Sequence, residues 1–288
     1  MTITGSRTNP GRWDSELDSR PCDRYNNAEC TIHLRIFLQQ VNPAGGARQG
    51  TARAWGTDEA GISGSGRGTA RKIVRWTAGT WSSWCRRYQR DVQAFWHGKF
   101  WLVPRRHFSD LDFTDRGVTY RPNVWCRFRL VLVDSSASAH KSISVVRLHT
   151  SERFFRSDSS HYDNRDIEFG SSRHHSQTFR QRAHVHEAGH ALGLPHASST
   201  NAACTGSGNV GHTSCYCATA LDCGNIMGAG ERLRPSNAAP WQQALEEHGV
   251  GIRTEWDVRM RRHYPMQIVP HLLREERPFG TTYRPARR

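Results

Sequence analysis

The eleven residues 186–196, with the sequence HEAGHALGLPH, constrain the fold of this 288-residue chain more than any other segment. On a helix, residues four positions apart differ by only about 40° in direction, so the imidazoles of His186 and His190 can bind one metal ion. Gly193 can adopt the positive φ that ends a helix, and the chain can then turn back and bring His196 to the same ion. The segment therefore predicts a helix that ends near Gly193 and a site with three histidine ligands.

Glu187, the residue after the first of these histidines, supplies a carboxylate next to the expected metal site. Three neutral imidazoles leave the fourth position of a tetrahedral zinc ion open, whereas a structural zinc site is closed by a fourth protein ligand. An open site lowers the pKa of its bound water to about 7, and an adjacent carboxylate can take a proton from that water as it attacks a carbonyl group. The spacing predicts Zn²⁺ as the cofactor, His186, His190 and His196 as its ligands, and Glu187 as the general base.

The pattern H-E-x-x-H-x-x-G-x-x-H resembles that of the metzincin metallopeptidases, and residues 186–196 are most similar to the matrixin branch. Metzincins also have a turn with a methionine beneath the zinc, and the segment 225–228, NIMG, stands at a suitable distance. The resemblance implies a zinc-dependent endopeptidase in which Met227 is the hydrophobic floor of the metal site. The chain departs from the family at Ala197, where matrixins usually have Ser or Asp. No tyrosine stands two residues after Met227, so the resemblance assigns no tyrosine to the transition state.

Hydrophobic periodicity predicts an α+β fold. Apolar residues between Trp81 and Trp96 recur at steps of three and four residues, and Gly98 stands where a C-terminal helix cap belongs. A further helix is predicted between Pro235 and Gly249. Strands are predicted at residues 31–38, 100–103, 124–133 and 142–148. We therefore expect a metzincin-like catalytic domain with a twisted mixed sheet, a long helix packed against it, the active-site helix and the Met-turn.

Composition divides the chain into three parts. Residues 1–27 are polar and without periodicity, and they are predicted to be a flexible N-terminal segment. Residues 28–250 are predicted to form the metzincin-like zinc peptidase domain, within which the glycine-rich stretch 45–68 is expected to be a loop. Residues 251–288 are predicted to be a C-terminal extension, with a short helix that starts at Thr254 and a frayed basic tail.

The eight cysteines, an even number, indicate a chain that meets oxidising conditions. Four of them lie between Cys204 and Cys223. They could hold a structural zinc ion, with His212 as an additional ligand, but the spacing Cys215-x-Cys217 lacks the two-residue spacer of a zinc knuckle. We therefore predict that disulfides tie this loop and shape one wall of the cleft, and that the chain binds one zinc ion. The pairing of the cysteines is left open.

Two further residues could be taken for members of the site. The segment Arg20-Pro21-Cys22-Asp23 is similar to a cysteine switch, in which a thiolate occupies the open zinc position, although the order of residues differs from the matrixin pattern. A disulfide between Cys22 and Cys30 is favoured instead. His184 lies about 200° around the helix from His186, so we expect it to face away from the metal.

The net charge of +14 arises from 40 Lys and Arg residues against 26 Asp and Glu residues. Only three of the 40 are lysines, and the arginines are spread from Arg7 to Arg288. This distribution is more typical of coding bias in a GC-rich genome than of a surface selected to bind phosphate. The expected partner is therefore a peptide or protein substrate rather than nucleic acid. The alternative is a basic nucleic-acid-binding protein in which the three histidines, with or without cysteines, hold structural zinc.

The hydropathy of the chain bears on its location. No stretch approaches the roughly 20 apolar residues of a membrane span, and residues 1–21 lack the apolar region of a secretory signal. Together with the cysteine content, this predicts a protein that is secreted or delivered outside the cell without a recognisable signal peptide. Standalone bacterial effector metallopeptidases resemble the chain in these respects.

Overall fold

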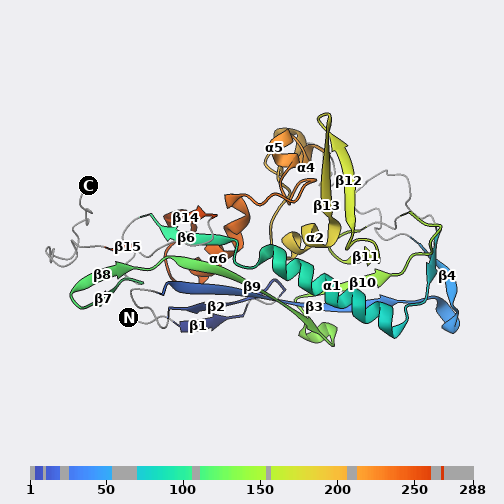
Figure 1. Ribbon diagram of the computed structural model, residues 1–288, viewed down its shortest axis with the longest axis horizontal. Helices are drawn as coiled ribbons and strands as arrows, with labels where there is room; N and C mark the ends of the chain where they lie inside the picture. The colour runs from blue at the N-terminus through green and yellow to red at the C-terminus, as the bar shows by residue number, and fades with distance from the viewer. Residues whose placement is uncertain are drawn as a thin grey trace. The chain divides into compact units, whose positions relative to one another are not determined.

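The computed structural model describes residues 4–8, 11–19, 26–53, 70–105, 111–153, 157–205, 213–260 and 267–268. Within them the chain is mixed α+β, with a mixed sheet and several helices, as predicted (Figure 1). It forms two compact units, each assembled from separate stretches of sequence. Unit 1 comprises Met1–His33, Trp96–Arg129 and Pro235–Arg288, and unit 2 comprises Leu34–Phe95 and Leu130–Arg234. All the predicted site residues, from His186 to Met227, belong to unit 2.

Unit 1 is built mainly from antiparallel strands. Its elements are β1 (Thr4–Arg7), β2 (Asp14–Asp18), β6 (Phe100–Pro104), β7 (Phe113–Asp115), β8 (Val118–Arg121), α6 (Ala239–Glu247), β14 (Trp256–Arg259), β15 (Gln267–Ile268) and the first parts of β3 (Ala28–Val41) and β9 (Val124–Val133). The main sheet has the order β1-β2-β3-β9-β6-β14. Trp241 of α6 is fully buried with its ring centroid 5.6 Å from that of Phe100, which places α6 against the core of this unit. The helix predicted between Pro235 and Gly249 is thereby confirmed.

Part of the N-terminal segment that was predicted to be flexible, residues 4–7 and 14–18, forms strands. Strand β1 pairs with β2, and β2 pairs in turn with β3 from Asp14↔His33 to Asp18↔Glu29. Trp13 and Leu17 have no exposed surface. The five-residue alternation in β2, which has Leu17 as its one apolar residue, is too short to be recognised in the sequence.

The end of the described chain also differs from its prediction. The short helix expected from Thr254 is a single 3₁₀ turn, Arg253–Glu255, which leads directly into β14. Strand β14 pairs antiparallel with β6, from Trp256↔Pro104 to Arg259↔Trp101, and this pairing holds the backbone extended. The predicted tail beyond Pro278 lies outside the described residues, as does Cys22.

Unit 2 combines a mixed sheet with helices. Its elements are β4 (Gln49–Arg53), β5 (Ala70–Val74), α1 (Ala78–Trp96), β10 (Lys141–Val146), β11 (His161–Asp163), β12 (Phe169–His174), β13 (Gln177–Arg182), α2 (Ala183–Ala191), α3 (Ala202–Thr205), α4 (Thr213–Tyr216), α5 (Ala220–Cys223) and the remaining parts of β3 and β9. Strand β10 is parallel both to β3 and to β11. The predicted loop at 45–68 is corrected in part, because β4 pairs with β5; residues 54–69 lie outside the described chain.

Helix α1 supports the site helix α2 within unit 2. Its residues Trp84, Tyr88 and Val92 are buried on one face, as the helical spacing predicted. The ring centroid of Tyr88 lies 5.7 Å from that of His184 on α2, and Trp84 Nε1 donates a hydrogen bond to the backbone oxygen of Asn164 at 3.2 Å. Within the described residues, neither α1 nor any other helix is long and apolar enough to cross a membrane.

Candidate metal centre

Helix α2 carries His186 and His190 and ends as the sequence predicted. Gly193 has a φ of +92°. The amide of Leu194 donates to the carbonyl of Gly189 at 3.0 Å, and the amide of Gly193 donates to the carbonyl of His190 at 2.9 Å. These two hydrogen bonds and the positive φ form a Schellman motif, which closes the helix and reverses the chain direction. The reversal brings His196 back to the face of α2 that carries the other two histidines.

The imidazole Nε2 atoms of the three histidines converge. Nε2 of His190 lies 3.1 Å from Nε2 of His186 and 2.9 Å from Nε2 of His196. Nδ1 of His186 donates to the carbonyl of Ile226 at 2.7 Å, and Nδ1 of His190 donates to the carbonyl of Leu194 at 2.8 Å. In a neutral imidazole the other nitrogen then carries no hydrogen, so Nε2 of both His186 and His190 presents a lone pair. Lone pairs at this distance repel each other unless a cation lies between them.

The protonation states favour metal binding. Burial, together with the neighbouring His190 and His196, lowers the pKa of His186 to about 3. Burial also lowers the pKa of His190. Both side chains are therefore neutral around pH 7, and the neutral imidazole is the form that binds a metal ion.

The three histidines fit a zinc ion. Their ligand nitrogens all lie within 4.8 Å of one another. In a tetrahedral site with zinc–nitrogen distances of about 2.0–2.1 Å, two ligand nitrogens lie about 3.3 Å apart, which is close to the separations seen here. Among the described residues the group has these three members and no fourth His, Cys, Asp or Glu. Such a donor set suits zinc and leaves a coordination position for a non-protein ligand.

The turn around Met227 is hydrogen-bonded to this segment. Met227 is buried, and its carbonyl accepts a hydrogen bond at 2.8 Å from the amide of Ala197, the residue after His196. The side chain of Asn225 closes the turn by accepting from the amide of Met227 at 2.8 Å. Ile226 also accepts the hydrogen bond from His186. The turn therefore contacts the ligand segment at its first histidine and just after its last one.

Two residues at the end of β13 hold this turn in place, and the sequence analysis missed both. Nε2 of Gln181 donates to the carbonyls of Ile226, Gly228 and Gly230 at 2.8, 3.0 and 2.8 Å. The next residue, Arg182, forms a two-pronged ion pair with Glu231, with Nε and Nη2 each 2.8 Å from a carboxylate oxygen. No sequence motif indicates these contacts, because the partners lie 45 to 49 residues apart.

We expect replacement of Gln181 by Leu to destabilise the fold of unit 2. Leu is of similar size but leaves three carbonyls without their donor, so the free energy of unfolding should fall by about 1–3 kcal/mol. Urea unfolding of the metal-free variant measures this change. The matched control is Gln177→Leu in the same strand, where the side chain is exposed. Equal stabilities of the two variants would contradict the role assigned to Gln181.

Glu187 is half-buried on α2, beside His186. Burial raises its pKa to about 8, with contributions from the nearby carboxylates of Asp158 and Asp166 and an opposing one from Lys141. Within the described part of the chain its carboxylate makes no hydrogen bond or ion pair. A divalent cation held by the histidines would favour the charged carboxylate. The general-base role of Glu187 stays a prediction.

His184 faces away from the metal centre, as expected. It has no exposed surface, its Nδ1 lies 2.9 Å from the backbone oxygen of Asp166, and its ring contacts Tyr88. Burial lowers its pKa to about 4. His184 is therefore a neutral core residue between α2 and α1.

The cysteine loop is tied by two disulfides, which confirms the predicted chemistry and supplies the pairing. Cys204 pairs with Cys215, and Cys217 pairs with Cys223. Cys30 is instead a free thiol buried in unit 1, so the favoured disulfide between Cys22 and Cys30 is wrong. Burial raises the pKa of the Cys30 thiol to about 12, which suppresses the reactive thiolate. His212 lies outside the described residues.

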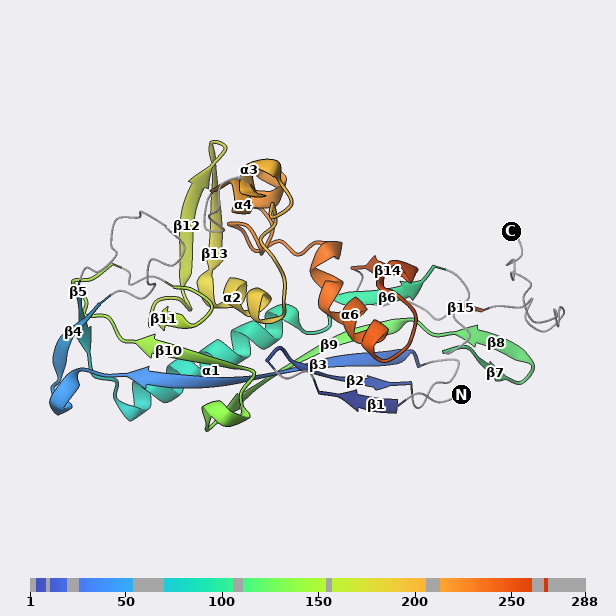
Figure 2. The ribbon, with the colours of Figure 1, turned by 180° about the vertical axis from the view of Figure 1, so that it is seen from behind.

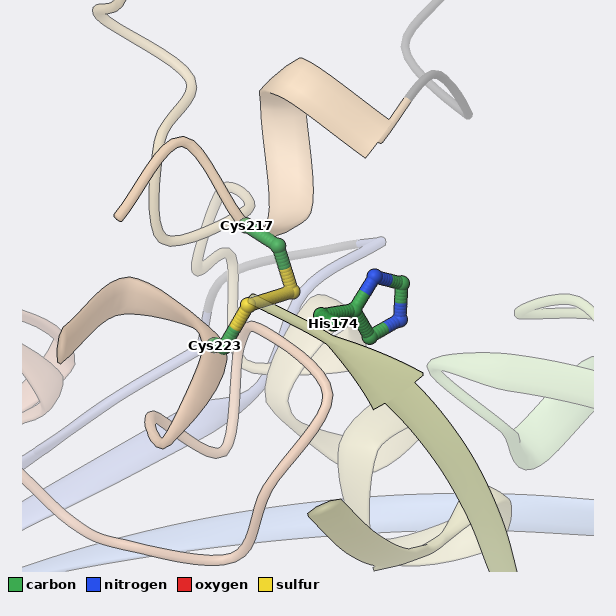
Figure 3. A group of neighbouring side chains, drawn as sticks. All are labelled: His174, Cys217 and Cys223. Atoms are coloured by element: carbon green, nitrogen blue, oxygen red, sulfur yellow. A yellow bond between two sulfur atoms is a disulfide. The ribbon is translucent and has the colours of Figure 1, made fainter. Parts of the chain in front are cut away.

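A second group of potential metal-ligand atoms includes the two sulfur atoms of the Cys217–Cys223 disulfide. It consists of His174, Cys217 and Cys223, whose ligand atoms lie within 4.8 Å of one another. Figure 3 shows the imidazole of His174, at the end of β12, next to the sulfur atoms of the Cys217–Cys223 disulfide. Metals bind cysteine as the thiolate, and a disulfide offers none. With these cysteines oxidised, the group is no zinc site.

Tyr216 is a site residue that the sequence analysis did not find. It lies at the end of α4 with its ring half-buried, and its ring centroid is 3.7 Å from that of His196 and 5.7 Å from that of His186. Figure 2 shows α4 and α3 near the β12–β13 hairpin, with α2 at the foot of that hairpin. The signal in the sequence was the position of Tyr216 between Cys215 and Cys217.

A cavity of about 420 Å³ opens beside the metal centre. Its lining comes from β12, the end of β13, the start of α2, the cysteine loop and the Met-turn: Gly170, Ser171, Ser172, His174, Gln181, Ala183, Tyr216, Gly228 and Ala229. Among the described strands, β12 pairs only with β13, so its other edge has no strand partner. The cavity therefore adjoins both β12 and Tyr216, the residue whose ring lies against that of His196.

No protein-family model matches the chain, no curated protein is detectably similar to it, and no solved structure matches its fold. The functional interpretation therefore depends on the geometry of the three histidines and the residues around them.

Proposed function

We propose that the protein is a zinc-dependent endopeptidase whose site is of the metzincin type. The observation that carries this proposal is the convergence of the three imidazoles: Nε2 of His190 lies 3.1 Å from Nε2 of His186 and 2.9 Å from Nε2 of His196. Nδ1 of His186 and Nδ1 of His190 each donate a hydrogen bond to a backbone carbonyl. Hydrogen bonds of this kind orient metal-ligating histidines in proteins. The half-buried Glu187 next to His186, free of partners in the described chain, supports hydrolysis as the chemistry.

The substrate in this proposal is an extended peptide segment of a protein. Its backbone would add to the unpaired edge of β12 by main-chain hydrogen bonds, the usual mode of strand addition. One substrate side chain would enter the cavity of about 420 Å³ that Tyr216, Gly228 and Ala229 line in part. In this proposal the scissile peptide bond would lie at the three histidines.

Each residue of the site has a separate role in the proposed hydrolysis. When bound, zinc supplies Lewis-acid chemistry, because it lowers the pKa of water and polarises a carbonyl oxygen. His186, His190 and His196 would hold the ion. Glu187 would accept a proton from the attacking water and donate it to the nitrogen of the leaving amine. The Met-turn would keep His186 oriented through the carbonyl of Ile226.

The nucleic-acid-binding alternative needs a closed zinc site. That site would take its fourth ligand from a cysteine thiolate, but all four cysteines of the nearby loop are in disulfides. No observation in the described chain favours this second function over hydrolysis.

We expect the purified chain to contain one zinc ion and to cleave unstructured peptides only when that ion is present. Metal analysis measures the stoichiometry, and a peptide-cleavage assay with and without a zinc chelator measures the dependence. Chelation should abolish cleavage, and added Zn²⁺ should restore it, because the water needs a Lewis acid at neutral pH. Two zinc ions per chain, one of them lost on replacement of Cys215 and Cys217, would instead support structural zinc. A chain that binds no metal would overturn the proposal.

A further inference from the structure

The backbone around Tyr216 is fixed from several directions. The residue before it, Cys215, is cross-linked to Cys204, and the residue after it, Cys217, is cross-linked to Cys223. The buried Ser198 adds two hydrogen bonds, since its amide donates to the carbonyl of Cys215 at 2.9 Å and its Oγ accepts from the amide of Ala218 at 3.0 Å. Two cross-links and two hydrogen bonds therefore restrain the backbone around Tyr216, whereas loops are usually more mobile than the elements they connect.

Ser198 also connects Tyr216 to the metal ligands through the backbone. It lies two residues after His196, and the residue between them, Ala197, donates a hydrogen bond to the carbonyl of Met227. The disulfide-bonded loop, the third ligand and the Met-turn therefore form one hydrogen-bonded assembly. Within it, the ring of Tyr216 lies against the ring of His196, with 3.7 Å between the centroids and 34° between the planes.

The three ligands are oriented by different contacts. His186 and His190 are on α2, and each donates from Nδ1 to a backbone carbonyl. His196 comes after the helix has ended, so the helix does not set its direction. The aromatic contact covers one face of its imidazole and limits the rotation of the ring, and Tyr216 also lies nearly parallel to His186, at 19°.

We propose that Tyr216 is a positioning residue that fixes the imidazole of His196 for metal binding, and that the two flanking disulfides hold it in place. This inference rests on the proposed zinc site. We assign the effect to the aromatic ring, because its contacts with His196 and His186 are the observations behind this inference. The cysteine loop then belongs to the metal centre, because it orients His196, the one ligand that does not lie on α2.

The test is the affinity for zinc, measured on the full chain by competition with a chromophoric chelator. The variant Tyr216→Ala should weaken zinc binding by about 10- to 100-fold, the usual effect of losing a group that orients a metal ligand, whereas Tyr216→Phe should stay within about twofold of the wild type. The matched control is Tyr120→Ala, which removes a half-buried tyrosine stacked on Phe113 in unit 1 and should leave zinc affinity unchanged.

A second readout separates positioning from general stability. Co²⁺ in place of zinc reports ligand geometry through its visible absorption, so the spectrum should change in Tyr216→Ala and be restored in Tyr216→Phe. The double variant Cys217→Ala with Cys223→Ala should shift zinc affinity in the same direction as Tyr216→Ala, with thermal unfolding of the metal-free protein as a check on folding.

The outcomes distinguish this inference from the function on which it rests. A wild-type chain that binds no metal overturns both. A wild-type chain that binds zinc, with Tyr216→Ala binding it equally tightly and showing an unchanged Co²⁺ spectrum, overturns the positioning role and leaves the metal site intact. A Tyr216→Phe variant as impaired as Tyr216→Ala would assign the effect to the hydroxyl and also overturn it.

Discussion

Glu187→Gln should leave zinc bound and remove most of the peptidase activity. The carboxylate serves the attacking water rather than the metal, and loss of a general base typically lowers the rate by about 10²- to 10⁴-fold. The three histidines keep their contacts in this variant, because no hydrogen bond in the described chain joins them to Glu187. The measurements are zinc content and kcat for a peptide substrate.

The control for this variant is Glu168→Gln. Glu168 is an exposed carboxylate of the same unit, paired with Arg87, and its neutralisation should leave kcat unchanged. Full activity of Glu187→Gln would remove Glu187 from the mechanism. Loss of zinc from the same variant would show that the carboxylate is instead a ligand or a structural support.

Gly228→Ala should be the most destabilising single-methyl substitution in the Met-turn. A Cβ atom at this position would lie 2.0 Å from the carbonyl oxygen of Asp222 and 2.9 Å from that of Tyr216. Both are backbone atoms of the disulfide-bonded loop, so they cannot rotate away as a side chain would. Overpacking of this kind costs about 1–3 kcal/mol, and urea unfolding should show a loss at the upper end of that range together with weaker zinc binding.

Gly224→Ala supplies a matched comparison within the same segment. Its φ is −68°, and a Cβ there would meet its nearest neighbour, the carbonyl oxygen of Leu221, at 3.6 Å, an ordinary contact. We expect its unfolding free energy to change by no more than about 0.5 kcal/mol. If Gly228→Ala proved as stable as Gly224→Ala, the close approach of the cysteine loop to the Met-turn would be contradicted.

The parts of the site that sequence reasoning found are those with local causes. The four-residue spacing of His186 and His190 follows from helical periodicity, and the return of the chain to His196 follows from the conformational freedom of Gly193. The helix α1 and the strands β3, β6, β9 and β10 were predicted for the same reason, because their apolar periodicity is long enough to be recognised.

The residues that escaped prediction depend on contacts between distant parts of the chain. Gln181 donates to carbonyls up to 49 residues away, and its type and spacing carry no signal of that role. Tyr216 reaches His196 only because two disulfides fold the loop back, and eight cysteines allow many pairings. The strands β1 and β2 are short, and Leu17 is their only large apolar residue, so their sequence carries little signal of the pairing of β2 with β3.

The order of the segments along the chain has a consequence for biosynthesis. The metal ligands and the residues that hold them lie between Gln181 and Glu231, so this part of unit 2 is complete once residue 234 has left the ribosome. Unit 1 includes Trp241 and Trp256 in its core and cannot close until those later residues emerge. Because domains fold as their sequence becomes available during synthesis, the ligand segment can assemble while unit 1 is still open.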